Sequence, residues 1–245
     1  MTDYDEASIT YNNSRVPDPK LVELFAVKVH ISRSTSLLDF GCGTGNYLSL
    51  IKELYDCKCH GVEPSDGMRT VANKKSPSLV IRKGDHKHIP FDDASFDFIF
   101  MTDVIHHVPD LNQMFQTLHP KLTANGLLCI VTESWDQICN RWYNRYFPSL
   151  ATNEKLRYPD IETIVHCALE NGVLLEEIVI NPNNAIIAVG ERFIQIVEEK
   201  NYSMFRHISE TERLNGLMEL RKDVGKTVHS EGAGESLVWL RKPRA

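Results

Sequence analysis

The stretch LLDFGCGTGN, residues Leu37–Asn46, decides the fold of this chain. An apolar run typical of a buried strand ends at Gly41, and a pattern with helical spacing begins near Tyr47. Glycines at such a junction let the backbone turn tightly and approach a ligand, and the helix N-terminus behind them favours electron-rich groups. A dinucleotide-binding loop requires G-x-G-x-x-G, but Asn46 stands at the third glycine position. The G-x-G-x-G pattern therefore indicates a ligand loop without a pyrophosphate, which argues against a dehydrogenase.

Strands and helices alternate on both sides of this stretch. Short apolar runs predict strands at residues 60–63, 79–82, 96–102 and 126–132, and helical spacing predicts helices near 17–29, at 47–55 and from about 110. This alternation implies right-handed βαβ units and an α/β fold, with a mostly parallel sheet covered by helices on both faces. Such doubly wound sheets bind ligands outside the carboxyl ends of their strands, where the strand order reverses.

The second half of the chain has a less regular pattern. It predicts helices at residues 159–169, 193–197 and 214–224, and strands at 173–180 and 236–240. No linker composition interrupts the sequence, so we expect a single domain over residues 1–245.

Composition narrows the class of protein. The 245 residues carry a net charge of −6, whereas a protein that holds a nucleic-acid backbone usually has a basic field. The six cysteines show no CxxC pair and no zinc spacing, which predicts reduced core thiols and no metal site. The N-terminus has no apolar leader, and no apolar run approaches the ~20 residues of a membrane span. The sequence thus predicts a cytoplasmic protein without a nucleic-acid or membrane partner.

An acidic residue follows the second predicted strand. Glu63 lies 22 residues after Gly41, and a carboxylate at this position can accept hydrogen bonds from both hydroxyls of a ribose. The strand, the glycine loop and this acid together indicate a ribose-binding site more specifically than any one of them does alone.

Four motifs resemble those of the class I S-adenosylmethionine-dependent methyltransferases, of the ubiquinone and menaquinone methyltransferase-like type (methyltransferase type 11 family). They are LLDFGCGTG at 37–45, GVEPS at 61–65 with Met68, GD at 84–85 ahead of IPF at 89–91, and FD at 96–97 through DVIHHVPD at 103–110. The resemblance covers about residues 11–132 well. It implies a Rossmann-like, doubly wound, seven-stranded sheet with an α-helical, aromatic substrate cap.

The resemblance also implies an organisation and an activity. Within one methyltransferase domain, residues 1–30 would form an N-terminal helical lid, 31–132 the cofactor-binding core, 133–172 an acceptor-site insertion, and 173–245 the C-terminal strands and helices. The protein would transfer a methyl group from S-adenosylmethionine to a small-molecule acceptor and release S-adenosylhomocysteine.

The residue roles come from the same resemblance. Gly41, Gly43 and Gly45 would pass beneath the methionine part of the cofactor, and Asp39 would orient this loop or reach the amino group. The ribose would be held by Glu63, the adenine would meet Met68, Asp85 and His86, and the methionine end would meet the main chain near Thr102. From the N-terminal segment, Tyr11 and Arg15 are candidates to close over the cofactor, and Arg15 could pair with its carboxylate.

Catalytic candidates are few, because methyl transfer from a sulfonium needs mainly positioning. His107 follows the fourth predicted strand and is the candidate general base, with His106 as a weaker one. The alternative is that His107 only hydrogen-bonds the loop.

The segment 135–147 leaves the nature of the acceptor open. Its aromatic residues form either a core stripe or a lid over the acceptor: Trp135, Trp142, Tyr143, Tyr146 and Phe147. Nearby charges of both signs would suit an anionic or a cationic acceptor: Arg141, Arg145, Arg157, Glu133 and Asp136. A methyltransferase for tRNA or protein, and a non-catalytic S-adenosylmethionine-binding protein, are the alternative functions.

Overall fold

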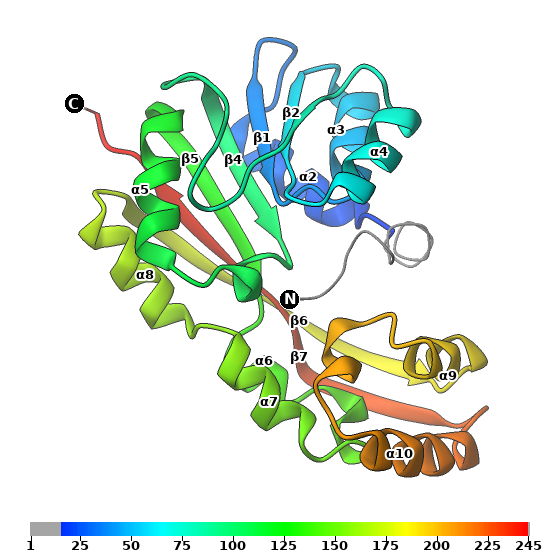
Figure 1. The fold of residues 1–245 in the computed structure, drawn as a ribbon. Coiled ribbons are helices and arrows are strands. Elements are labelled where there is room, and N and C mark those ends of the chain that lie inside the picture. Colours follow the sequence, from blue (N-terminus) through cyan, green and yellow to red (C-terminus); the bar gives the residue numbers. More distant parts are fainter. Residues whose placement is uncertain (1–15, 245) are drawn as a thin grey trace. The chain divides into compact units, whose positions relative to one another are not determined.

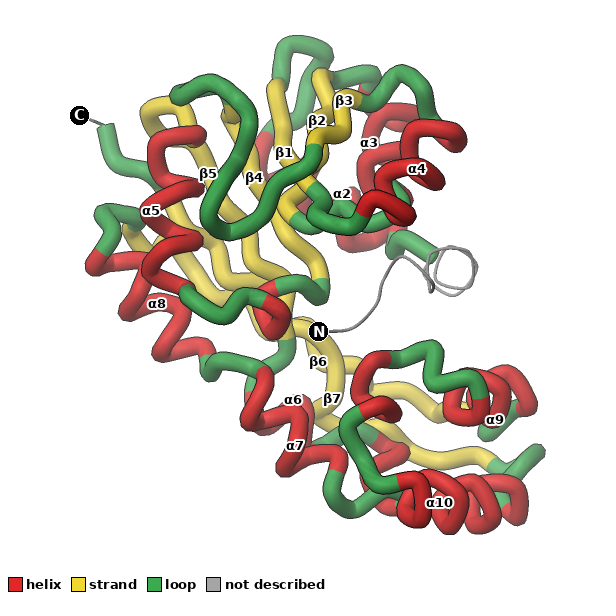
Figure 2. The backbone as a smooth tube through the Cα atoms, in the orientation of Figure 1, coloured by secondary structure: helices red, strands yellow, loops and turns green. Residues whose placement is uncertain are grey.

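The computed structural model describes residues 16–244 (Figures 1 and 2). The chain divides into two compact units. The first unit comprises the residues up to Val131, Glu162–Ile178 and the residues from Val238 onward, and the second unit comprises Thr132–Ile161 and Val179–Leu237.

A seven-stranded sheet organises the chain in the order β3-β2-β1-β4-β5-β7-β6. The strands are β1 (Ser36–Phe40), β2 (Lys58–Val62), β3 (Val80–Arg82), β4 (Phe96–Thr102), β5 (Leu122–Thr132), β6 (Leu174–Ala188) and β7 (Thr227–Arg241). The pairs β1–β2, β2–β3, β1–β4 and β4–β5 are parallel, and β7 runs opposite to β6 (Figure 1). The strand order reverses between β1 and β4, which marks the expected place of a ligand. The predicted doubly wound, mostly parallel sheet is confirmed.

Five longer helices of the first unit lie within residues 16–244. They are α2 (Pro19–Val29), α3 (Asn46–Tyr55), α4 (Asp66–Lys75), α5 (Leu111–Lys121) and α8 (Ile161–Glu170). The Phe25 ring of α2 packs on Phe98 and Phe100 of β4, with ring centroids 5.3 and 5.1 Å apart. Tyr47 of α3 meets Phe100 as well, so α2 and α3 cover one face of the sheet. The helices α5 and α8 lie on the other face (Figure 1), as right-handed crossovers require.

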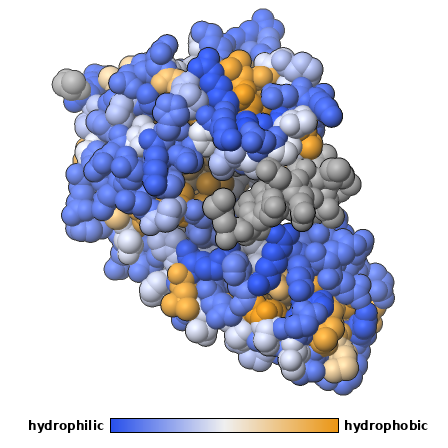
Figure 3. Space-filling model, in the orientation of Figure 1, coloured by the Kyte–Doolittle hydropathy of each residue, from blue (hydrophilic) through white to orange (hydrophobic). Residues whose placement is uncertain are grey.

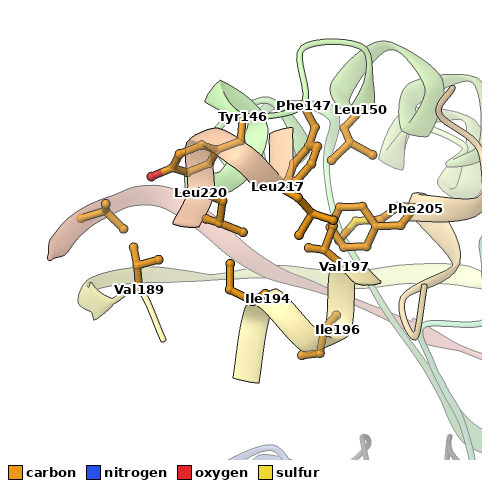
Figure 4. Packing of buried hydrophobic residues seen from close by; sticks show 12 residues of the cluster. Tyr146, Phe147, Leu150, Val189, Ile194, Ile196, Val197, Phe205, Leu217 and Leu220 are labelled. Carbon is orange, nitrogen blue, oxygen red and sulfur yellow. The ribbon is translucent and has the colours of Figure 1, made fainter. Parts of the chain in front are cut away.

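The second unit has a hydrophobic core of its own. It contains α6 (Trp135–Cys139), α7 (Leu150–Arg157), α9 (Glu191–Glu198) and α10 (Glu210–Lys222). Figure 4 shows Phe147, Phe205 and Leu217 pointing toward one another, and all three side chains are buried. A Cβ on Gly216 of α10 would lie 2.2 Å from the Phe147 ring, so the absence of a side chain there admits this ring. Long-range packing of apolar side chains stabilises this unit.

The aromatic segment 135–147 belongs largely to this core. Tyr146 and Phe147 are buried in it, and Trp142 and Tyr143 pack against it. Trp135 differs, because it is 42% exposed and its indole N–H donates to the Tyr158 carbonyl at 3.0 Å. The core interpretation therefore holds for four of these five side chains.

The strand β5 begins at Leu122 rather than at residue 126, and β6 and β7 exceed their predicted lengths by more residues. β6 continues to Ala188 through the Asn181–Pro182 pair, which resembles a turn, and β7 begins at Thr227 although Gly232 has a positive φ of 71°. Proline is tolerated at the edge of a sheet, and β6 is an edge strand. Glycine accommodates a distorted strand backbone, which explains why a strand continues there.

The burial of the α3 side chains and of the cysteines agrees with the sequence prediction at most positions. In α3, Leu48 and Ile51 are fully buried, whereas Leu54, which shares their helical spacing, is 54% exposed. Five of the six cysteines are buried and Cys139 is exposed. No helix within the described residues is long and apolar enough to span a membrane, and hydrophilic residues cover most of the face in Figure 3.

Candidate functional site

The glycine loop connects the carboxyl end of β1 to α3 and is hydrogen-bonded to the carboxyl end of β2. Gly41, Gly43 and Gly45 have φ values of 79°, 54° and 72°, a region that side chains disfavour. The N–H groups of Gly41 and Cys42 both donate to the Val62 carbonyl, at 2.8 and 3.1 Å. This geometry explains the G-x-G-x-G spacing, because each glycine supplies one left-handed residue of the turn.

Neighbouring segments approach the loop closely. A Cβ on Gly41 would lie 2.7 Å from a methyl carbon of Val104, just after β4. A Cβ on Gly61 of β2 would lie 2.6 Å from the Cys42 sulfur. The loop is therefore fixed between the end of β2 and the segment after β4, which places it where the strand order reverses.

Alanine substitutions at two glycines should separate backbone strain from this steric contact. Gly45→Ala should destabilise by about 1–2 kcal/mol, because a left-handed conformation costs that much for a residue with a Cβ, while its Cβ would meet only ordinary contacts from 3.5 Å. Gly41→Ala should cost about 1–3 kcal/mol more, because the new methyl overlaps Val104.

Urea unfolding of the two variants tests this difference. The double variant Gly41→Ala/Val104→Ala should be more stable than the sum of its single effects, since the smaller residue relieves the overlap. Equal losses at the two glycines, or strictly additive effects, would contradict the packing described.

Glu63 lies directly against the glycine loop. Its two carboxylate oxygens accept the N–H groups of Gly43 at 3.0 Å and of Ser65 at 2.9 Å. The Ser65 hydroxyl in turn caps α4 by accepting the Met68 N–H. The side chain of Glu63 is buried, and these hydrogen bonds hold a negative charge at the end of β2.

Asp39 brings a second carboxylate to the same place. Burial, and then the charge of nearby Glu63, hold the pKa of Asp39 well above its ordinary value. Its Oδ1 and the hydroxyl oxygen of Thr44 are buried without a hydrogen-bond partner among the described residues. Buried polar atoms are nearly always paired, so these atoms fit a bound group that donates hydrogen bonds to the loop, as the amino group of S-adenosylmethionine would.

Asp39→Asn should raise the melting temperature of the ligand-free protein at pH 8 and should leave it nearly unchanged at pH 4. The folded-state pKa of Asp39 is raised, so its favourable contribution is present at low pH and is lost as the pH rises through that value. Asparagine removes this buried ionisation. The exposed Asp92→Asn is the control, and an unchanged or lower melting temperature for Asp39→Asn at pH 8 would be the contrary result.

The predicted adenine residues follow β3. A Cβ on Gly84 would lie 2.7 Å from Val62, so this segment adjoins the end of β2. Asp85 is exposed and its Oδ1 accepts the N–H groups of Lys87 and His88. The His86 Nε2 is buried without a partner among the described residues, and Met68 is fully buried in α4. Their contacts with adenine stay predictions.

His107 lies at the same edge of the sheet as the glycine loop. It ends a short 3-10 turn, its N–H donates to the Val104 carbonyl at 2.8 Å, and Val104 contacts Gly41. Its exposed ring packs on His106 with ring centroids 4.0 Å apart. Thr102 ends β4 just before this turn. This position is compatible with the predicted base, whereas Tyr11 and Arg15 lie outside the described residues.

A buried ion network in the second unit went unrecognised in the sequence. Arg141 binds Glu133 through Nε at 3.0 Å and Glu154 through a terminal nitrogen at 3.2 Å. Arg157 pairs with the same Glu154 carboxylate at 2.5 Å. Arg141 and Glu154 are buried. The two arginines are therefore balanced by the two carboxylates of Glu133 and Glu154, and Arg141 is committed to these rather than to an anionic acceptor.

Known proteins resemble this chain in its first unit. Residues 38–130 match the family described as methyltransferase domain. An uncharacterized methyltransferase of Oceanobacillus iheyensis is 35% identical over 96 residues, which cover 38% of this chain and 44% of that protein. Demethylmenaquinone methyltransferase of Staphylococcus epidermidis is 28% identical over 110 residues, covering 42% and 46%. The chain thus spans less than half the length of these curated relatives.

A solved structure matches nearly the whole fold. It is a putative methyltransferase from an antibiotic biosynthesis pathway of Anabaena variabilis, with a TM-score of 0.74 and 20% identity, covering 92% of this chain and 98% of that one. The sheet order and the glycine loop define the class I methyltransferase fold. Residues 38–130 are thus similar in sequence to the methyltransferase domain family, and the fold as a whole is similar to that of the solved methyltransferase.

Proposed function

We propose that this protein transfers the methyl group of S-adenosylmethionine to a small-molecule acceptor and releases S-adenosylhomocysteine. The observation that carries the proposal is the pair of buried acids against the glycine loop. Glu63 is fixed by the Gly43 N–H, and Asp39 presents an oxygen without a partner among the described residues. Carboxylates placed in this way suit the hydroxyls of a ribose and the amino group of a methionine.

The cofactor supplies the reactive methyl group, and the protein contributes position and protection from water. In this proposal Gly41, Gly43 and Gly45 pass beneath the methionine part, while Thr102 supplies main chain near it. Met68, Asp85 and His86 surround the adenine, and Arg15 pairs with the cofactor carboxylate.

His107 is the proposed general base for acceptors that must lose a proton. Its place after β4, joined to Val104 and hence to the glycine loop, supports this role. Residues 133–172 are proposed to contribute to the acceptor site. The net charge of −6 favours a small molecule over RNA.

Incubation with methyl-labelled S-adenosylmethionine tests the proposal. The purified protein is mixed with a small-molecule extract, total RNA or a protein extract, and each product is analysed by mass spectrometry. We expect label in the small-molecule mixture only. Label in RNA or protein alone would replace the proposed acceptor class, and binding of S-adenosylhomocysteine without any transfer would favour a non-catalytic binding protein.

A further inference from the structure

Two cysteines lie side by side at the start of β2, within the first unit. Cys57 is the last residue before the strand, and Cys59 is the second residue of the strand. Alternate residues of an extended chain point to the same face, and the two sulfur atoms accordingly lie 3.5 Å apart. Both residues are free thiols and both are buried. Because Glu63 follows the other end of β2, this pair lies away from the glycine loop.

The backbone spacing of the pair suits a disulfide. Two residues of a strand span about 6.6 Å, and the Cα atoms of disulfides lie about 4.4–6.8 Å apart. To form the bond, the sulfur atoms must approach each other to about 2.0 Å. The Lys58 N–H donates to the Thr35 carbonyl at 3.0 Å, whereas Cys57 lies outside the strand in the turn after α3. This turn can therefore absorb the movement without a change in the sheet.

The surroundings make the two thiols chemically unequal. The hydrogen bond with Cys59 lowers the pKa of Cys57, and the ammonium group of Lys52 lowers it as well, although burial opposes both effects. Lys52 is held there because its Nζ donates to the Cys57 carbonyl at 3.0 Å. The shared hydrogen bond and burial raise the pKa of Cys59. Since the thiolate is the nucleophilic form of cysteine, Cys57 is the nucleophile of the pair and Cys59 retains its proton.

The cover over the two sulfur atoms is thin. Asp56 and Lys58, which flank Cys57 in the chain, are both exposed, and Cys59 is itself 5% exposed. The Lys52 ammonium, which lies over the turn, is held at the surface by Asp56 at 2.9 Å, and surface ion pairs of this kind contribute little stability. Surface turns open locally at a low free-energy cost. A reagent close to water in size can therefore reach the thiols, whereas a peptide disulfide is too large.

We propose that Cys57 and Cys59 form a redox-reactive dithiol that a hydroperoxide converts to an intramolecular disulfide. Their separation of 3.5 Å on one face of the chain, next to the Lys52 ammonium, carries the proposal. This modification site does not depend on the proposed methyl transfer.

The reaction with hydrogen peroxide has two steps. The Cys57 thiolate first attacks one oxygen, so that an S–O bond forms and the O–O bond breaks, and the departing hydroxide takes up the proton that Cys57 has released. The Cys59 sulfur then attacks the sulfur of the Cys57 sulfenic acid. The S–S bond forms, the S–O bond breaks, and hydroxide leaves as water with the proton of Cys59. Two thiols are thus oxidised to one disulfide while one peroxide is reduced to two waters.

Peptide mapping of the folded full chain after treatment with hydrogen peroxide tests the proposal. The chain carries Cys139→Ser, which removes the exposed thiol that could link two molecules. Trypsin cleaves after Lys58, between the two cysteines, and places them on separate peptides, residues 53–58 and 59–69. We expect mass spectrometry to find these peptides joined by a disulfide, and separate again after reduction with dithiothreitol. Two unmodified thiols, or two separate sulfinic acids, would overturn the proposal.

The buried Cys129 of β5 is the internal control in the same digest. It should stay a thiol under the peroxide concentration that closes the pair. Oxidation of Cys129 to the same extent would also overturn the proposal, because the pair would then have no reactivity of its own.

A serine variant tests the order of the two steps. In Cys59→Ser, the Cys57 sulfenic acid has no thiol to react with, so dimedone should trap it. The chain with both cysteines should give at least about tenfold less dimedone adduct, because Cys59 consumes the sulfenic acid. Equal amounts of adduct in the two proteins would contradict the proposal. Peptide mapping uses neither substitution of the pair, so it decides the proposal even where serine is poorly tolerated at this buried position.

Discussion

Replacing His107 by alanine should lower the turnover of methyl transfer by about 10²–10⁴-fold, the usual contribution of a general base. The affinity for S-adenosylhomocysteine should stay nearly unchanged, because His107 is joined to the glycine loop through Val104 and does not line it directly. Steady-state kinetics with labelled cofactor and calorimetry with S-adenosylhomocysteine measure the two effects separately.

Two further variants separate proton transfer from a structural role of this histidine. His107→Gln retains hydrogen bonding without titrating, so it should be as slow as the alanine variant if a proton moves. His166→Ala, on the exposed side of α8, is the control. Full activity of His107→Gln alone would show that the side chain only hydrogen-bonds its loop. Full activity of both His107 variants would show that this side chain has no role in methyl transfer.

Glu63→Ala should weaken S-adenosylhomocysteine binding by about tenfold or more. A buried carboxylate that accepts both ribose hydroxyls contributes roughly 1.5–3 kcal/mol per charge-assisted bond before compensation by water. The variant also leaves the N–H groups of Gly43 and Ser65 without their acceptor, so the loop itself should become less ordered.

Calorimetry together with thermal unfolding measures this effect. The exposed Glu53→Ala of α3 is the matched control for charge. A folded Glu63→Ala protein with the dissociation constant of the unaltered chain would show that this carboxylate does not hold the ribose.

The first unit could be predicted from sequence because its signals are local. The glycines at 41, 43 and 45 have a left-handed backbone, and Glu63 directly follows the second strand, so the position of each can be predicted from its sequence neighbours. Parallel strands with helical crossovers then bring the carboxyl ends together at one edge. Neighbouring acids and glycines of this edge were therefore predictable without any knowledge of packing.

The second unit depends on contacts between distant residues, which local patterns do not reveal. The aromatic segment resembles both a core stripe and a lid, and only its packing against residues near 193–220 decides for the core. In the sequence, Arg141 is a candidate to bind an anionic substrate, and only the structure shows its ion pair with Glu154. The side chain of Gln137 is held by a hydrogen bond from the Ser236 hydroxyl, which is 99 residues away in the sequence.

Calorimetric titration of the purified chain with S-adenosylhomocysteine, and separately with NAD, tests the central claim most directly. Beside the glycine loop, Glu63 and the buried Asp39 can accept hydrogen bonds from a ribose and from an amino group. Asn46 occupies the position at which a dinucleotide-binding loop requires glycine. We predict saturable binding of S-adenosylhomocysteine and no heat with NAD. Tight NAD binding without an S-adenosylhomocysteine signal would contradict the account.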